Sequence, residues 1–466
     1  MRRSGVRSPS APPISTLSVS AIHPAVVRRL PVAIDLLALH ASNPKRYPFL
    51  LESTAPASGQ NRFDILFACP QETVTATALE RTFLPRFNAA WQRARVDKDG
   101  AALGMPFAGG WFIYLGYELA GEIEPSLRLP VSGGEFPAAI ATRIPAAVIR
   151  DRSSGETILV AEGGHEPLID VLERDVHSAT AVAYALASPL AGPLKEEPVK
   201  WFLTAVLAAK DYIRAGDIYQ ANLSRLWSAD ISPEVTHASL YDRLRRANPA
   251  PFAGLAVFGD RAIVSSSPER LVEVRDGRIA ARPIAGTRPR GEGTEDAALA
   301  SELIGHPKER AEHIMLVDLV RNDLSRVAVP GTVRVDEMMT VESYSHVHHI
   351  VSNVAAELVS GVTPADVVRA VFPGGTITGC PKVRAMEIIA ELEGVARGPY
   401  TGALGYIGHD GSMDLNILIR TMVRDGSRLT FRTGAGIVAD SEPERELAET
   451  RAKALGLARA LTGDLS

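Results

Sequence analysis

Short strand-like runs of apolar residues in this chain are separated by turns rich in Gly and Pro, and elsewhere apolar residues recur at helical spacing. In the first part of the chain, strands are predicted at residues 63–68, 111–116, 146–150 and 157–161, and a helix near 166–186. Further strands are predicted at 253–257, 262–265, 271–275, 402–407 and 429–433. Further helices are predicted near 201–215, 295–323, 364–371, 381–394 and 442–462. Strands and helices are therefore expected to mix throughout.

A segment rich in Pro and Gly at residues 187–198 predicts a linker. It separates an N-terminal region at 21–186 from a C-terminal region at 199–466, and 466 residues are enough for two domains. Residues 1–20 contain several arginines and no acidic residue, and their prolines argue against the amphipathic helix of a transit peptide. We expect a disordered or mis-started tail there.

The composition indicates a soluble globular protein. Hydrophobic residues make up 46% and charged residues 22% of the chain, which excludes a disordered one. The formal net charge of −4 argues against a general polyanion binder, so no nucleic-acid partner is expected. No apolar run approaches the roughly 20 residues of a membrane helix, so no membrane association is expected. Only Cys69 and Cys380 are present, which excludes a disulfide framework and favours a reducing cytoplasm.

The most informative segment is 372–387, which reads Phe-Pro-Gly-Gly-Thr-Ile-Thr-Gly-Cys-Pro-Lys before an apolar periodic run. It predicts a glycine-loosened turn that leads into a helix with Pro381 near its first turn. Free N–H groups at such a helix start favour an anion, and Thr376, Thr378 and Lys382 can add donors. A plain turn is the alternative.

Two predicted helices each carry a pair of carboxylates three residues apart, Glu309 with Glu312 and Glu446 with Glu449. Residues at this spacing share one helix face. A capping box at 441–444 would fix the start of the second helix and the direction of its pair. Facing carboxylates suit a hard divalent ion such as Mg²⁺. The alternative is a solvated charged face, because Arg and Lys residues lie among these glutamates.

The segment at 372–387 resembles the chorismate-utilising enzymes. This family contains anthranilate synthase component I, aminodeoxychorismate synthase component I, and the isochorismate and salicylate synthases. The resemblance extends from about residue 201 to the C-terminus and is weaker before residue 190. It implies an α/β (α+β) fold of two antiparallel sheets packed face to face, with helices outside and the active site in the C-terminal half.

The resemblance also implies a Mg²⁺ site between two helices. The motifs Lys-Glu-Arg-Ala-Glu-His at 308–313 and Glu-Arg-Glu-Leu-Ala-Glu-Thr at 444–450 match the family's two helices. By position, Glu312 and Glu449 would bind the metal, which also holds the substrate's ring carboxylate. Glu309 and Glu446 would lie beside them, and one of the two would protonate the departing 4-hydroxyl.

Further matches imply the substrate pocket. The run Gly-Ala-Gly-Ile-Val-Ala-Asp at 434–440, after a predicted strand, resembles a carboxylate cradle with Gly434 and Gly436 at its centre. Other positions match residues that contact the substrate or support those that do. They are Arg420 for the enolpyruvyl carboxylate, Thr376 and Tyr400 for substrate, His349 for the departing hydroxyl, and Glu269 and Lys453 beside them. The histidines His346, His348 and His349 lack the further spaced ligands of a transition-metal site.

Two positions bear on the reaction. Many aminodeoxychorismate synthases carry a nucleophilic lysine where this chain has Ala285, which has no nucleophile to offer. The motifs at 218–224 and 413–420 nevertheless look more like aminodeoxychorismate synthase, so Mg²⁺-dependent amination of chorismate for 4-aminobenzoate and folate synthesis is the favoured function. Anthranilate synthase component I and a non-catalytic chorismate-binding subunit remain alternatives. Gln220 stands where water-adding relatives place a lysine base, which disfavours isochorismate and salicylate formation.

The amination implies a partner, because neither Cys69 nor Cys380 lies in the elbow of a glutamine amidotransferase nucleophile. A separate amidotransferase subunit would therefore supply ammonia. Two further segments, 49–53 and 248–252, resemble those that enclose tryptophan in the family. The implied tryptophan site consists of Glu52, Ser53, Asn248, Pro249, Pro251 and Phe252. The alternative is a strand packed against a turn.

Overall fold

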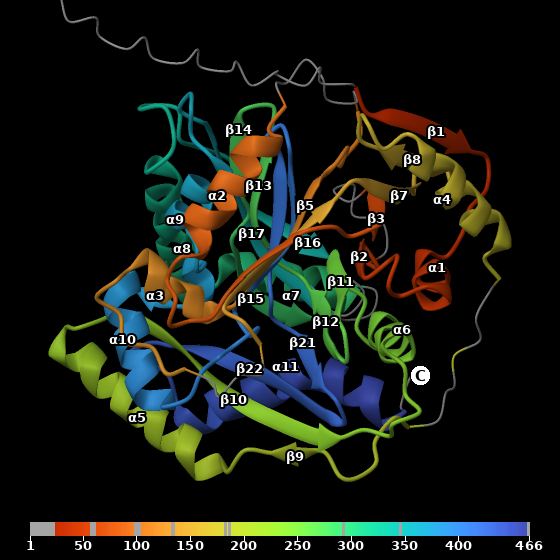
Figure 1. The fold of residues 1–466 in the computed structure, drawn as a ribbon. Helices are drawn as coiled ribbons and strands as arrows, with labels where there is room; N and C mark the ends of the chain where they lie inside the picture. The colour runs from red at the N-terminus through yellow and green to blue at the C-terminus, as the bar shows by residue number, and fades with distance from the viewer. Residues whose placement is uncertain are drawn as a thin grey trace, which may run out of the picture.

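Two large antiparallel sheets form the centre of the protein (Figure 1). The computed structural model describes residues 24–55, 62–96, 104–131, 136–180, 184, 188–290, 294–343 and 347–463. The predicted tail at 1–20 and His346 lie outside these residues. No helix in the described ranges is long and apolar enough to span a membrane.

The larger sheet has twelve strands within the described residues. In order across the sheet they are β1 (Val26–Leu30), β8 (Thr157–Ala161), β7 (Ala146–Asp151), β3 (Phe63–Ala68), β2 (Phe49–Glu52), β11 (Phe252–Phe258), β12 (Arg261–Ser267), β21 (Thr421–Asp425), β22 (Arg428–Ile437), β10 (Gln220–Asp230) and β18 (Gly379–Cys380), with β9 (Lys195–Glu196) paired to β10. The N-terminal strands thus occupy one end and the C-terminal strands the other.

The second sheet has ten strands in the same described ranges. In order they are β15 (Ile284–Pro289), β17 (Val347–Glu357), β14 (Arg278–Ala281), β13 (Arg270–Arg275), β20 (Met413–Ile417), β19 (Ala403–Gly408), β5 (Gly110–Leu115), β6 (Ala139–Ile144) and β4 (Thr73–Ala76), with β16 (Arg334–Ser343) paired to β17. Strands from before and after residue 187 therefore lie side by side in both sheets.

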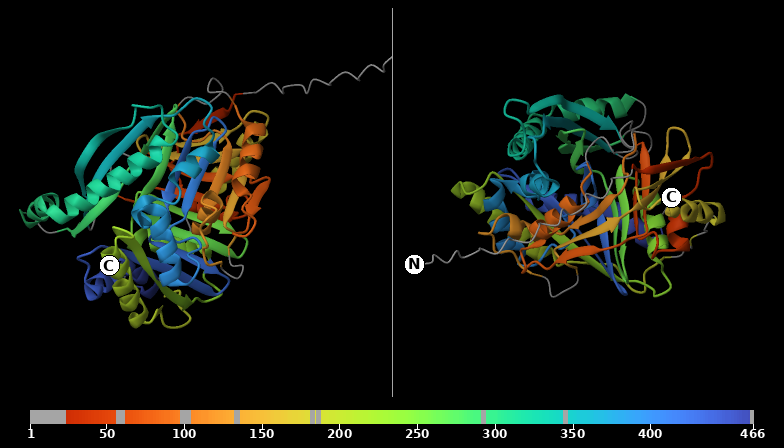
Figure 2. Two further views of the ribbon diagram at one scale, coloured as in Figure 1. Left: turned by 90° about the vertical axis from the view of Figure 1, so that its left-hand side faces the viewer. Right: turned by 45° about the horizontal axis from the view of Figure 1, so that its top comes forward.

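Apolar side chains are buried on both faces of these sheets. The facing sides meet in an aromatic core, in which Phe49 and Phe67 of the first sheet pack against Phe112 of the second. Helices cover the outer sides (Figures 1 and 2). They are α1 (Leu36–Ser42), α4 (Pro167–Ser178), α5 (Val199–Ala215), α6 (His237–Ala247), α10 (Lys382–Glu393) and α11 (Pro443–Thr462) on the first sheet, and α2 (Phe83–Ala94), α8 (Pro307–Ser325) and α9 (Pro364–Val371) on the second. The predicted fold of two packed antiparallel sheets with outer helices is confirmed.

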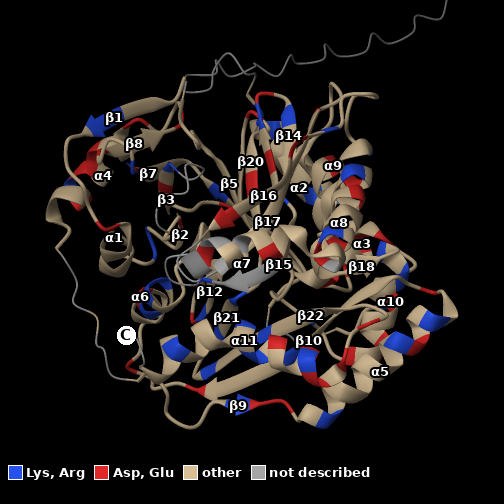
Figure 3. Ribbon diagram, turned by 180° about the vertical axis from the view of Figure 1, so that it is seen from behind, with Lys and Arg blue, Asp and Glu red and all other residues tan. Residues whose placement is uncertain are grey.

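The remaining helices are short or lie to one side. They are α3 (Ala120–Ile123), α7 (Thr294–Gly305) and the 3₁₀ turns η2 (Tyr117–Leu119) and η3 (Gly375–Ile377). In the left view of Figure 2, α7, α8 and β16 form one side of the molecule, opposite the N-terminal strands. Figure 3 shows acidic and basic positions interspersed along the helices seen from behind.

The structure corrects several predicted helix bounds. The helix predicted at 295–323 is two helices, α7 and α8, because Pro307 begins a new helix at its first position. The helix predicted at 166–186 ends at Ser178, since its C-cap residue Ala179 is already extended. The capping box predicted at 441–444 is wrong. Glu442 is the N-cap of α11 without a side-chain bond, and the Ser441 hydroxyl accepts from the N–H of Val438 instead.

Candidate active site

Polar side chains lie on one face of the first sheet where β10 pairs with β22. Opposed residues of an antiparallel pair share a face, and Gln220, Asn222 and Ser224 alternate along one face of β10. Asn222 is opposite Gly436 and Ser224 is opposite Gly434 on β22. The residues between them, such as Leu223 and Ala435, are apolar and pack under α5 and α10. The inward face is therefore polar and lined with glycine.

Gly434 and Gly436 lie within β22, and not after it as the sequence predicted. The pairing of β21 with β22 ends at Met422 and Phe431, so no described strand covers residues 432–437 on that side. The carbonyl of Gly434 faces this edge, because it accepts from Lys453 Nζ at 3.0 Å. The N–H groups of Gly434 and Gly436 point the same way, since a strand residue directs its N–H and C=O to one side. This edge suits an anion.

Lys453 is held at this edge by a glutamate of its own helix. Its Nζ lies 2.7 Å from Glu449 Oε1, four residues earlier on α11. Both side chains remain substantially exposed, at 38% and 48%, so the pair itself contributes little to stability. The cation Lys453 and the predicted metal ligand Glu449 therefore both lie beside the glycine-lined edge of β22.

Side chains from three other elements approach the two glycines. A Cβ on Gly434 would lie 2.6 Å from the Tyr400 hydroxyl and 2.7 Å from Asn222 Oδ1, so only glycine fits. Next to Gly436, the Gln220 amide donates to Glu312 Oε1 at a long 3.5 Å. The side-chain oxygens of Gln220 and Asn222 are buried without a hydrogen-bond partner among the described residues. Such acceptors are rare unless a ligand or water satisfies them.

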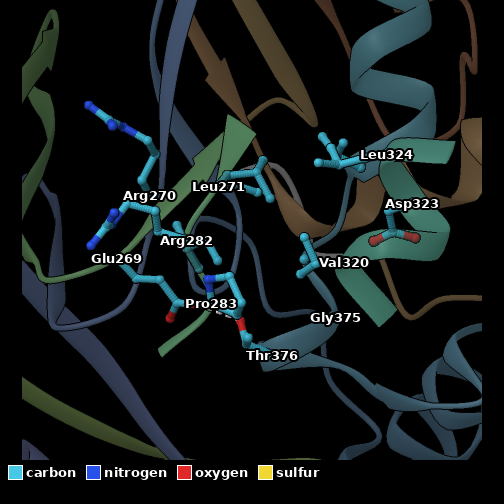
Figure 4. Close-up of a pocket in the computed structure, with 14 residues that line it drawn as sticks. Glu269, Arg270, Leu271, Arg282, Pro283, Val320, Asp323, Leu324, Gly375 and Thr376 are labelled. Atoms are coloured by element: carbon cyan, nitrogen blue, oxygen red, sulfur yellow. Dashed lines mark hydrogen bonds between the residues drawn. The ribbon is translucent and has the colours of Figure 1, made fainter. Parts of the chain in front are cut away.

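Glu269 is the most perturbed carboxyl near this face. It follows β12, is 5% exposed, and accepts from the Thr376 hydroxyl at 2.8 Å (Figure 4). Burial raises its pKa to about 7, while the Thr376 hydrogen bond and the charges of Lys453 and Arg420 act in the opposite direction. Glu269 therefore exchanges its proton near neutral pH.

Arg420 completes this group in a strained conformation. Its φ of 50° is left-handed, which is costly for a residue other than glycine and is found mostly at functional sites. Burial lowers its pKa and the charge of Glu269 opposes that effect, so the two side chains act on each other. The predicted carboxylate-binding arginine thus lies with Glu269, Thr376 and Lys453.

His349 and Glu309 meet at Gly286 of β15. His349 is 3% exposed, and its Nδ1 lies 3.2 Å from the Gly286 carbonyl. Burial and the charge of Arg420 lower its pKa to about 4, so the ring is neutral at pH 7. Because a carbonyl only accepts, Nδ1 carries the proton and Nε2 is an acceptor. Glu309 Oε2 lies 3.0 Å from the position of a Cβ on Gly286, which brings the predicted acid close to this histidine.

The neighbouring histidine faces elsewhere. His348 bonds through Nδ1 to Ser343 and through Nε2 to Asp296. Adjacent strand residues point to opposite faces, so His348 and His349 do not form a common site.

Two of the glutamates predicted to bind a metal ion lie at the glycine-lined part of β22. Glu312 of α8 contacts the Gln220 amide beside Gly436. Glu449 of α11 pairs with Lys453, whose Nζ donates to the Gly434 carbonyl at the open edge of β22. No group of three or more His, Cys, Asp or Glu side chains in the described ranges is spaced to hold a metal ion. Mg²⁺ commonly uses one or two carboxylates and completes its shell with water and substrate. The residues present fit such a site in chemical type.

Two donors predicted in the turn before α10 have other partners. Lys382 Nζ binds Asp323 at 2.6 Å, and the Thr378 hydroxyl donates to the Gly374 carbonyl at 2.9 Å. A small cavity of about 20 Å³ extends from Glu269 and Thr376 toward Asp323 (Figure 4). Of the three predicted donors, only Thr376 therefore faces the Glu269 group.

The segments of the implied tryptophan site lie together. Glu52 of β2 is opposite Ala253 of β11, and the Thr54 N–H donates to the carbonyl of Ala250. Glu52, Pro251 and Phe252 line a cavity of about 110 Å³. Ser53 donates its N–H to Asp64, and Asn248 donates to Ser266.

Comparison with known proteins identifies the family. The chorismate binding enzyme family matches residues 47–459. The chain belongs to this family. It is 44% identical over 365 residues to an anthranilate synthase component I-like protein of Synechocystis, covering 77% of this chain and 74% of that protein. It is 41% identical over 368 residues to aminodeoxychorismate synthase component 1 of Bacillus subtilis, covering 76% and 77%.

Solved structures of this family share the fold. Anthranilate synthase component I from Streptococcus pneumoniae superposes with a TM-score of 0.76 at 32% identity, over 87% of this chain and 93% of that one. The menaquinone-specific isochorismate synthase from Escherichia coli has a TM-score of 0.71 at 18% identity, over 95% of each chain. The resemblance to chorismate-utilising enzymes is confirmed at the level of the family.

Three residues near the site were not predicted from the sequence. Asn222 was not predicted, although its position two residues after Gln220 places it on the same strand face. Glu393 and Arg397 were missed as a pair, because Glu393 ends α10 and Arg397 lies in the turn beyond it, where helical spacing predicts no contact. They form an ion pair, with 4% and 1% of the side chains exposed.

Proposed function

We propose that this protein is a magnesium-dependent enzyme that aminates chorismate to 4-amino-4-deoxychorismate, for 4-aminobenzoate and folate synthesis. The observation that carries the proposal is the glycine-lined edge of β22, where N–H groups and Lys453 offer a site for one carboxylate. Arg420, beside Glu269, offers a site for a second. Chorismate carries two carboxylates, one on the ring and one on the enolpyruvyl group.

Each side chain then has a role that follows from its contacts. Gly434, Gly436 and Lys453 would bind one substrate carboxylate, and Arg420 the other. Tyr400 and Gln220 would border the ring, since both approach the two glycines. Neutral His349 would accept a hydrogen bond from the 4-hydroxyl, and Glu309 or Glu446 would protonate that oxygen as it departs. Glu269 would hold a proton near neutral pH, bonded to Thr376.

Glu312 and Glu449 would hold the Mg²⁺ ion, with Glu309 and Glu446 beside them. When bound, the ion would neutralise the ring carboxylate and polarise the ring toward loss of the hydroxyl.

The position of Ala285 bears on how nitrogen is added. Ala285 is 7% exposed and follows Ile284, whose N–H donates to Glu269. Because the methyl side chain of Ala285 is no nucleophile, ammonia would add directly to the ring. The ammonia would come from a separate glutamine amidotransferase subunit, and the enzyme would work in the cytoplasm.

The alternative product is anthranilate, formed with release of pyruvate. It is favoured by Ala285 and by relatives named anthranilate synthase component 1, one of which, from Thermus thermophilus, is 43% identical over 375 residues. Incubation with chorismate, Mg²⁺ and ammonium at mildly alkaline pH separates the two, followed by fluorescence and mass spectrometry. We expect a non-fluorescent amino adduct that yields 4-aminobenzoate when an aminodeoxychorismate lyase is added. Fluorescent anthranilate with pyruvate would contradict the proposal and support the alternative.

A non-catalytic chorismate-binding subunit is the remaining alternative, and the absence of any chorismate consumption would support it. The cavity at Glu52, Pro251 and Phe252 is proposed as a tryptophan site. Calorimetric titration of tryptophan into the protein tests that assignment, and no heat of binding at millimolar tryptophan would reject it.

A further inference from the structure

A buried ion pair lies behind the proposed substrate pocket and contacts three of the segments that line it. Glu393, the last residue of α10, binds Arg397 through two contacts, at 2.7 Å and 3.0 Å. The same carboxylate accepts the N–H and hydroxyl of Ser224 on β10, both at 2.8 Å. The pair is therefore anchored to the strand that carries Gln220 and Asn222.

The guanidinium of Arg397 extends this network to two loops. It donates to the carbonyl of Asn222 at 2.6 Å and to the carbonyl of Ile377 at 3.2 Å. It also reaches the Thr401 hydroxyl at 3.4 Å and lies over the Tyr400 ring, 5.5 Å from its centroid. One side chain thus contacts β10, the turn after Thr376 and the loop of Tyr400.

These three segments carry the side chains that surround Gly434 and Glu269. Asn222 Oδ1 and the Tyr400 hydroxyl lie 2.7 Å and 2.6 Å from the position of a Cβ on Gly434, and Thr376 bonds to Glu269. Asn222 Oδ1 is buried without a hydrogen-bond partner among the described residues, as expected of an acceptor that binds a ligand. A small movement of any one segment would change the width of the pocket over Gly434.

Arginine is suited to such a contact because its planar fork can donate to several acceptors at fixed angles. A lysine would keep the charge opposite Glu393 and lose most of the directed bonds. Stability alone is a weak explanation, since buried ion pairs often add little to the free energy of unfolding.

We infer that Arg397, held by Glu393, is a positioning residue that sets the substrate pocket by fixing Asn222, Ile377 and Tyr400 relative to one another. It does not touch the substrate itself. The inference rests on the proposed function, because the pocket that it sets is the one assigned to chorismate.

The test compares Arg397→Lys with a matched control. Arg143 on β6 has only 11% of its side chain exposed, binds Glu162 at 2.5 Å and 2.6 Å, and donates to the carbonyls of Gly110 and Ile144. It belongs to the opposite end of the second sheet from β15. Arg143→Lys therefore removes the same kind of contact without touching the pocket. A milder variant, Tyr117→Leu, removes the ring that lies 4.9 Å below the Arg397 guanidinium.

The kcat and KM for chorismate are measured for all variants at a temperature where each is folded by circular dichroism. We expect Arg397→Lys to raise KM at least tenfold, Tyr117→Leu to raise it less, and Arg143→Lys to leave it within twofold of the wild type. If Arg397→Lys does not fold, a rise with Tyr117→Leu alone supports the inference.

Two results would count against it, and they are distinguishable. Unchanged KM in the folded Arg397 and Tyr117 variants, or an equal rise in Arg143→Lys, would overturn the positioning role while the wild-type activity stands. A wild-type protein that does not consume chorismate would reject the proposed function, and the inference with it.

Discussion

Replacement of Gly434 by alanine tests the proposed pocket where side chains crowd against β22. The new Cβ would lie 2.6 Å from the Tyr400 hydroxyl, 2.7 Å from Asn222 Oδ1 and 2.7 Å from the carbonyl oxygen of Leu223. Optimal contacts between non-bonded heavy atoms are about 3.5–4.0 Å. Asn222 can turn its amide away, but the Leu223 oxygen belongs to the backbone of β10 and cannot move alone.

The strand or Tyr400 must therefore shift by several tenths of an ångström. Overpacking of this kind costs about 1–3 kcal/mol. If the cost falls on substrate binding, kcat/KM for chorismate drops by about 5- to 150-fold, since each 1.4 kcal/mol is a factor of ten. Steady-state kinetics with ammonium as nitrogen donor measures this, with thermal unfolding recorded in parallel.

A control and a partial rescue sharpen the result. Gly192→Ala is the control, because no atom lies within 4 Å of its added Cβ. Combining Gly434→Ala with Tyr400→Phe removes one of the three close contacts, so part of the loss in kcat/KM should return relative to Tyr400→Phe alone. The reasoning is refuted if Gly434→Ala keeps the kcat and KM of Gly192→Ala.

Three further predictions concern charge and chemistry. Between pH 4.5 and about 7 the folded protein binds more protons at Glu269 than the unfolded chain, so wild-type stability falls across this window. The free energy of unfolding of Glu269→Gln, measured by denaturant titration, should therefore rise relative to that of the wild type by up to about 3 kcal/mol between pH 4.5 and pH 8, at 1.36 kcal/mol per pKa unit. A difference in free energy of unfolding that does not change with pH would contradict the raised pKa of Glu269. Glu312→Ala should abolish chorismate consumption while circular dichroism stays unchanged, and full turnover would remove this residue from the site. Ala285→Lys should form a covalent adduct with chorismate that is visible in the intact protein mass, whereas an unmodified mass would show that position 285 does not face the ring.

The residues explain what the sequence could and could not predict. Spacing of three on a helix identified the carboxylates of α8 and α11, and short apolar runs between turns identified β3 and β8 with their exact bounds. The strand β10 was not predicted, although residues 220–224 alternate between polar side chains on the inner face and apolar ones on the outer face. The strands β16 and β17 were also missed, since β16 is mostly exposed and its charged residues hide the strand pattern.

Contacts between distant segments were not predictable at all. Arg397 donates to Asn222 across a long stretch of sequence, and no local pattern specifies that bond. Lys382 resembled an anion donor by its place at a helix start, but Asp323 of α8 binds it in the folded protein. Such partners depend on how the two sheets pack, which periodicity does not specify.

The interleaving of early and late strands has a consequence for synthesis of the chain. β2 pairs with β11, and β5 pairs with β19, so both strands leave the ribosome long before their partners exist. Their open edges can pair wrongly with other chains during that time. Folding must also close loops that span much of the sequence, which slows it. The nascent N-terminal half is therefore expected to depend on chaperones until residue 408 has emerged.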